Sequence, residues 1–140
     1  MKKQLTIEII KAFLIVLFLY AAISKLVEIH DFQQELSKSP MLHAVAKLLA
    51  IGVPSIELFI CSLLLYSKTS HTGFILSLFL LTSFTAYLII TINYSTYVPC
   101  SCGGVISQLS WNQHILLNFF FILLSITGIL LSASLRKSLV

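Results

Sequence analysis

Two cysteines separated by a single residue, Cys100 and Cys102, are the residues of this sequence best suited to chemistry. A disulfide between them would close a very small ring, and strained disulfides are the more oxidising and labile ones. The pair therefore suits electron exchange with another thiol better than it suits holding a fold together. Gly103 and Gly104 follow directly, and their backbone freedom lets the chain turn sharply and leaves both sulfur atoms accessible.

Three other interpretations of the pair remain open: thiols that never oxidise, a structural disulfide, and two ligands of a metal ion. A zinc site needs about four protein ligands, and only His114 follows nearby on the same side. We therefore favour redox exchange and predict no metal site. The third cysteine, Cys61, lies within an apolar run, and we expect it to be a small buried core residue.

A second unusual residue is Glu57, which lies about ten residues into an apolar run and so close to the bilayer midplane. A carboxylate there is costly and indicates either a functional role or a structural hydrogen bond between helices. We expect it to face the bundle interior and to pair with Lys25 first and Asn118 second. Lys25 starts roughly 10 to 12 Å further out, so a water or a kink at Pro54 would have to close the gap. His114 is a candidate for proton transfer beside the cysteine pair.

The composition requires a membrane to position these residues. Hydrophobic residues make up 58% of the 140 residues and charged residues 10%, and the mean hydropathy is +0.99. A soluble fold this small could not bury so much apolar surface. We predict an all-α integral membrane four-helix bundle forming one domain over residues 1–140. Its spans are expected at about residues 7–27, 45–66, 74–92 and 113–133, since a span needs roughly 20 apolar residues.

Three connections join the predicted spans. Residues 28–40 place Phe32 and Leu36 four residues apart among charged neighbours, which predicts a short amphipathic helix at the membrane interface between the first and second spans. Residues 67–73 form a tight polar turn. Residues 93–112 carry no formal charge and contain both Cys100 and Cys102.

The basic residues set the predicted orientation. One side has Lys2, Lys3, Lys11, Lys68, Arg136 and Lys137, and the other has Lys25, Lys38 and Lys47. Six against three places both termini in the cytoplasm by the positive-inside rule. The cysteine loop then faces outward, into a compartment where disulfides persist. Because these charges do not form one cluster, the sequence gives no support for nucleic-acid binding.

The order of these motifs resembles a known family. It runs from Ser24-Lys25 and Phe32 through Pro54 and Glu57 to Cys100-Ser101-Cys102-Gly103-Gly104, Trp111 and Asn118. It is similar to the DoxX-like superfamily, and within it to the MauE-type redox-associated membrane proteins. The resemblance implies a bacterial inner-membrane protein of periplasmic thiol and disulfide chemistry, with Cys100 and Cys102 as redox pair and Lys25 and Glu57 as intramembrane polar pair. Gly104 departs from the pattern, where many members have an aromatic residue before a glycine.

Two classes of function fit these features. The first is a thiol–disulfide oxidoreductase that passes electrons between a periplasmic thioredoxin-like or disulfide-rich partner and a membrane carrier, for which we expect a quinone. The second is a non-enzymatic subunit that anchors or assembles a larger membrane complex, with structural cysteines. The short loops favour the second class, and the strained cysteine pair favours the first.

Overall fold

The computed structural model describes residues 1–94 and 110–140, and all regular structure in these residues is helical. Five α-helices and one 3-10 turn follow in the order α1 (Lys2–Val27), α2 (Ile29–Lys38), η1 (His43–Val45), α3 (Ala46–Leu65), α4 (Ser70–Tyr94) and α5 (Trp111–Ser138). The expected all-α class and the short helix between the first two spans are therefore confirmed.

Four of these segments are long and apolar enough to cross a membrane: Lys2–Val27, His43–Leu65, Ser70–Tyr94 and Trp111–Ser138. The helices extend beyond most of the predicted spans. The first begins at Lys2 rather than near residue 7, and the last ends at Ser138 rather than near residue 133. Hydropathy marks only the part of a helix that lies in hydrocarbon, whereas the hydrogen-bonded turns continue into the polar interface.

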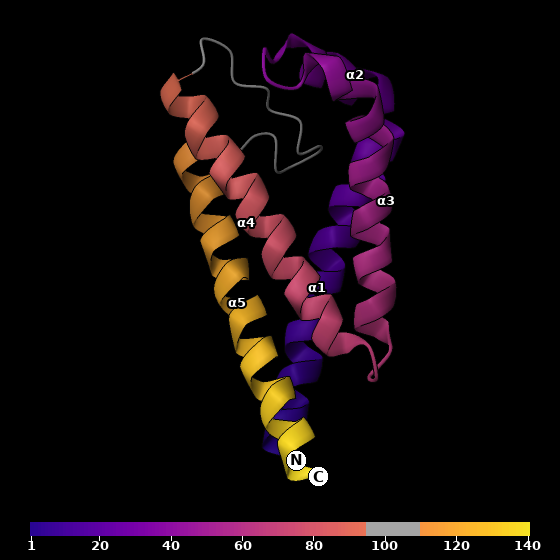
Figure 1. Cartoon of the computed structure of the whole chain (residues 1–140), viewed down its shortest axis with the longest axis vertical. Helices are drawn as coiled ribbons and strands as arrows, with labels where there is room; N and C mark the ends of the chain where they lie inside the picture. The colour runs from indigo at the N-terminus through magenta and orange to yellow at the C-terminus, as the bar shows by residue number, and fades with distance from the viewer. Residues whose placement is uncertain (95–109) are drawn as a thin grey trace.

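The helices form a ring in which each spanning helix contacts two others. α1 packs mainly on α3 and α4 mainly on α5, and contacts of α3 with α4 and of α1 with α5 close the ring. Both termini lie at one end of the molecule together with the α3–α4 turn, and α2 lies at the other end (Figure 1). The end of α4 and the start of α5 also lie at the α2 end.

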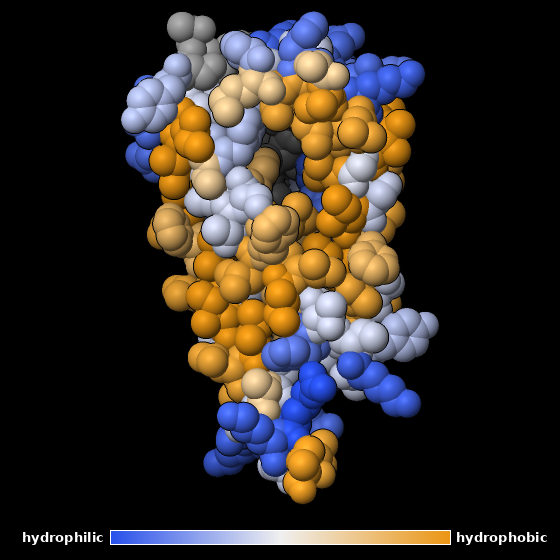
Figure 2. Space-filling view, in the orientation of Figure 1, coloured by the Kyte–Doolittle hydropathy of each residue, from blue (hydrophilic) through white to orange (hydrophobic). Residues whose placement is uncertain are grey.

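The core and the outer surface of the ring are both apolar. Leu14, Ile60 and Phe74 from three different helices are fully buried in the main cluster. Large hydrophobic residues also cover the outside, as in Phe79 and Leu116. Figure 2 shows this surface as a band of hydrophobic residues between two hydrophilic ends. Such a band is what a bundle in contact with lipid requires.

α2 covers one end of the bundle as a separate small layer. Its Phe32 and Leu36 are buried against Ala46 and Ala50 of α3, so the predicted apolar face of this helix is the face that packs. The chain then turns at Ser39, whose buried hydroxyl accepts a hydrogen bond of 3.2 Å from the hydroxyl of Tyr87 in α4. This bond links the α2 end to a helix on the other side of the ring.

Gly128 permits the close approach of α4 and α5, and its replacement should destabilise the bundle. A Cβ atom at this position would lie 2.6 Å from ring carbons of the fully buried Phe74. We expect Gly128→Ala to lower the free energy of unfolding by about 1–3 kcal/mol, the usual effect of overpacking, and to lower the melting temperature in detergent. Gly52→Ala is the matched control, because a Cβ atom there meets nothing within 4 Å. Equal melting temperatures for the two variants would contradict this account of α4–α5 packing.

Candidate functional site

A cavity of about 160 Å³ lies between the helices in the half of the bundle nearer α2. All five α-helices contribute to its wall, with Leu17 from α1, Phe32 from α2, Val53 from α3, Phe84 from α4 and Leu117 from α5 among the apolar residues. Figure 2 shows a hollow in this half of the molecule, with hydrophobic residues on one side and residues of intermediate hydropathy on the other. Most of the wall is apolar, so the few polar groups in it decide what chemistry the cavity supports.

An ion pair forms part of the cavity wall. The Lys25 ammonium group of α1 lies 2.8 Å from Oε1 of Glu57 in α3, and both side chains are only 7% exposed. The predicted first partner of Glu57 is thus in direct contact, and no bridging water is needed. A buried charge without such a partner would cost several kcal/mol, so each of these groups depends on the other.

The distance expected from sequence between Lys25 and Glu57 is closed by the direction of the lysine side chain. Helical side chains point back toward the N-terminus of their helix, and in α1 this direction leads deeper into the bundle. Nζ of Lys25 accordingly lies within 3.5 Å of the carbonyl oxygen of Ala21, one turn earlier. The rise per residue gives the depth of the Cα atom of Lys25 and not that of its ammonium group, so the distance expected from sequence is too long.

Two polar atoms near the ion pair have unused hydrogen-bonding capacity. Within residues 1–94 and 110–140, Oε2 of Glu57 and Nδ2 of Asn118 have no hydrogen-bond partner. The expected second contact, between Asn118 and Glu57, is therefore not made there, although both side chains are buried and both line the cavity. Buried polar groups are usually paired, so an unpaired acceptor and an unpaired donor together favour a site that receives a polar ligand group.

Aromatic side chains of α4 and α5 also line the cavity. His114 is buried in the wall, and its ring centroid lies 5.7 Å from that of Phe84 at an interplanar angle of 51°. Tyr87, one turn beyond Phe84, also lines the cavity. Sequence reasoning identified His114 but missed both α4 residues. Their spacing, with Leu80 four residues before Phe84, places them on one helix face and was the signal that could have found them.

The structure describes one of the three cysteines and not the other two. Cys100 and Cys102 lie outside the described residues, so their roles stay predictions. Cys61 is buried as expected, with its thiol 3.7 Å from the carbonyl oxygen of Ile15.

α5 begins with a capping box in which the Ser110 hydroxyl accepts from the backbone N–H of Gln113 and the Gln113 side chain accepts from the Ser110 N–H. No group of three metal-ligating side chains occurs in the part of the chain that the structure describes.

Comparison with known proteins gives one match that covers most of the chain. The model of the family described as methylamine utilisation protein MauE matches residues 3–131. No curated protein and no solved structure matches the sequence. The matched range contains all of α1 except Lys2, all of α2 to α4, most of α5, and every residue of the cavity wall named above.

The ion pair predicts a non-additive double-mutant cycle. Glu57→Gln and Lys25→Met should each lower the free energy of unfolding by about 3–5 kcal/mol, because each leaves an uncompensated buried charge. The double variant removes both charges and should lose less than the sum, with a coupling of about 0.5–3 kcal/mol. Unfolding in mixed detergent micelles measures all four proteins.

The control for this cycle is the more exposed pair Glu35 and Lys38 of α2, joined at 2.9 Å. Its Gln and Met variants should couple by less than about 1 kcal/mol, as solvent-exposed pairs do. A buried pair that coupled no more strongly than this one would contradict the dependence of Lys25 and Glu57 on each other.

Proposed function

This chain belongs to the methylamine utilisation protein MauE family, and from that premise we propose that it is a membrane thiol–disulfide oxidoreductase. Cys100 and Cys102 exchange electrons with a thioredoxin-like or disulfide-rich partner outside the cytoplasm. The cavity between the helices receives the membrane-soluble electron carrier, a quinone. The family and the apolar helices long enough to span a membrane are shown. The electron transfer, the quinone and the redox role of the cysteine pair are proposed.

One observation carries the proposal: the cavity with its buried ion pair lies in the half of the bundle where α4 ends and α5 begins. The sequence that joins these two helices contains Cys100 and Cys102. The proposal accordingly assigns the thiol pair and the carrier site to the same end of the protein. That arrangement suits transfer between a partner outside the bilayer and a carrier within it.

The residues of the cavity fit a quinone head group. Lys25 and Asn118 supply N–H donors, which the two carbonyl oxygens of a quinone can accept. The unpaired Nδ2 of Asn118 is the clearest sign of a missing acceptor. Phe32 and Phe84 supply apolar aromatic surface, against which a ring can pack. These groups would bind and orient the ring and exclude water from it.

The proposed reaction balances without a further reactant. Oxidation of the two thiols forms one S–S bond and releases two electrons and two protons. A quinone supplies the matching half-reaction, since its reduction takes up two electrons and two protons. His114, in the cavity wall, is positioned to carry protons, because an imidazole can both accept and donate one near neutral pH.

The location follows from the same reasoning. We place the chain in a bacterial inner membrane with both termini in the cytoplasm, on the excess of Lys and Arg at the end that holds the termini. The cysteine sequence then faces the periplasm, where disulfides form. The order of the motifs also supports placing this family in the DoxX-like superfamily.

Single-cysteine variants should trap the partner. With Cys100→Ser or Cys102→Ser, the remaining thiol can form a mixed disulfide that no second thiol resolves. We expect a reductant-sensitive adduct on non-reducing gels of whole cells, and none with the control Cys61→Ser. A membrane-impermeant maleimide should label the reduced pair in intact cells. If the pair keeps one constant oxidation state and no adduct forms, the chain is instead a non-enzymatic subunit with structural cysteines.

Narrowing the cavity should slow electron transfer to the quinone. Leu117 lines the cavity, whereas its neighbour Leu116 is 71% exposed on the outer surface. We expect Leu117→Phe to slow oxidation of the reduced cysteine pair by a short-chain quinone about tenfold, which corresponds to about 1.4 kcal/mol. Leu116→Phe should react at the wild-type rate. The absorbance of the quinone follows the reaction, and equal rates for both variants would rule out the cavity as the quinone site.

A further inference from the structure

A second cavity, of about 340 Å³, lies in the opposite half of the bundle, which holds both termini and the α3–α4 turn. Residues of α1, of the turn, of α4 and of α5 all contribute to its wall. Unlike the first cavity, it has polar and charged side chains from every one of these segments. The proposed thiol exchange uses none of them.

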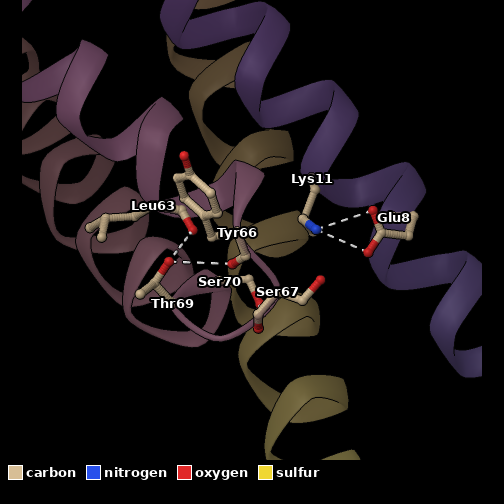
Figure 3. A network of polar contacts seen from close by, with 7 residues as sticks. All are labelled: Glu8, Lys11, Leu63, Tyr66, Ser67, Thr69 and Ser70. Carbon is tan, nitrogen blue, oxygen red and sulfur yellow. Dashed lines mark hydrogen bonds and ion pairs between the residues drawn. The ribbon is translucent and has the colours of Figure 1, made fainter.

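The charges around this cavity are mainly positive. Lys68 of the turn and Arg136 of α5 both line it, together with the imidazole of His71 in α4. Glu8 also lines the cavity, but Nζ of Lys11 lies 2.9 and 3.1 Å from its two oxygens. Figure 3 shows the Lys11 side chain directed at both oxygens of Glu8, with the turn residues beside it. The acidic group is thus compensated within α1, and the net field in the cavity favours an anion.

Hydrogen bonds hold part of the wall in place. Nδ1 of His71 lies 2.7 Å from Oγ of Ser132 in α5, and the Ser132 hydroxyl also donates to the carbonyl oxygen of Ile129 at 3.0 Å. The contact with Ser132 joins α4 to α5 and fixes the plane of the imidazole. Because Nδ1 is used by Ser132, Nε2 is the ring nitrogen left to meet a ligand.

The cavity also has an apolar part. Ile7 of α1 and Leu135 of α5 line it together with the charged groups, and Leu139, beside them, is largely exposed. The site therefore lies where charged helix ends adjoin the hydrophobic band, at the depth of lipid head groups. A ligand that joins a phosphate to an apolar chain matches both parts of this wall.

We propose that this cavity binds the phosphate group of an anionic membrane lipid. Lys68 and Arg136 contact the phosphate oxygens by charge-assisted hydrogen bonds. Ile7 and Leu135 contact the start of the acyl chains. The lipid thereby ties α5 to the α3–α4 turn. The same phosphate chemistry could come from a free anion, but the apolar part of the wall favours the lipid.

The general excess of positive charge at this end does not by itself explain the site. That excess orients a membrane protein wherever the basic residues lie along the helix ends. Here Lys68 and Arg136 come from different segments and line one cavity, whereas the neighbouring Lys137 does not line it. Arg136→Gln and Lys137→Gln remove the same charge from adjacent positions. Comparing these two variants therefore distinguishes binding at a defined site from diffuse attraction of the protein to an anionic surface.

Native mass spectrometry of the full chain in detergent tests the proposal. Phosphatidylglycerol should bind more tightly than phosphatidylcholine with identical acyl chains. Arg136→Gln and Lys68→Gln should each weaken phosphatidylglycerol binding about tenfold, the loss expected for one charge-assisted hydrogen bond. Lys137→Gln should bind it like the wild type. Lys68, Arg136 and Lys137 are exposed, so the variants should fold, and their melting temperatures without added lipid verify this.

Three outcomes would overturn the proposal. Equal weakening by Lys137→Gln and Arg136→Gln would show a diffuse charge effect. Equal binding of the two lipids would remove the need for net negative charge. Displacement of bound phosphatidylglycerol by millimolar inorganic phosphate would assign the cavity to a free anion instead of a lipid. None of these measurements involves the cysteines or the first cavity, so the result is independent of the proposed thiol exchange.

Discussion

A charged group inside a bilayer costs much free energy, and the rest of this structure depends on how that cost is met. The contact between Lys25 and Glu57 lowers it for both groups. Neither group could stay ionised in hydrocarbon alone. Their contact fixes α1 against α3 at the level of the first cavity, and these two helices form one of the two most extensive helix contacts in the bundle. A wholly apolar pair of helices could slide or rotate with little penalty. The ion pair selects one register, which is the role that buried polar groups are best known to play.

The positions of α4 and α5 account for the rest of the wall of the first cavity. α4 and α5 pack tightly around Phe74 and Gly128, near the end that holds the termini. Toward the other end α4 diverges from α3, and α2 lies across this end, packed on α3 (Figure 1). The hydrogen bond from Tyr87 to Ser39 ties this wider end together. Tight packing at one end and a polar link at the other thus leave room for a cavity without a large loss of packed surface.

Much of this arrangement could be predicted from the sequence. Four spans follow from hydropathy, and Glu57 with Lys25 stands out because charges are rare in such segments. The amphipathic spacing of Phe32 and Leu36 also predicts which face of α2 packs. Phe84 and Tyr87 could not be chosen in the same way, because aromatic residues are common in every span and only tertiary packing shows which of them face a cavity. The tight contact of Gly128 with Phe74 depends equally on how two distant segments meet.

Because every α-helix contributes to the first cavity, occupancy and folding are thermodynamically linked. A molecule that binds there contacts groups which come together only in the assembled bundle. It therefore stabilises the folded protein as a whole, by about 2.7 kcal/mol at a hundredfold excess over its dissociation constant. The resistance of the protein to heat then reports on the lipid-soluble contents of the membrane around it. A bundle depleted of such molecules during purification would be the less stable form of the same chain.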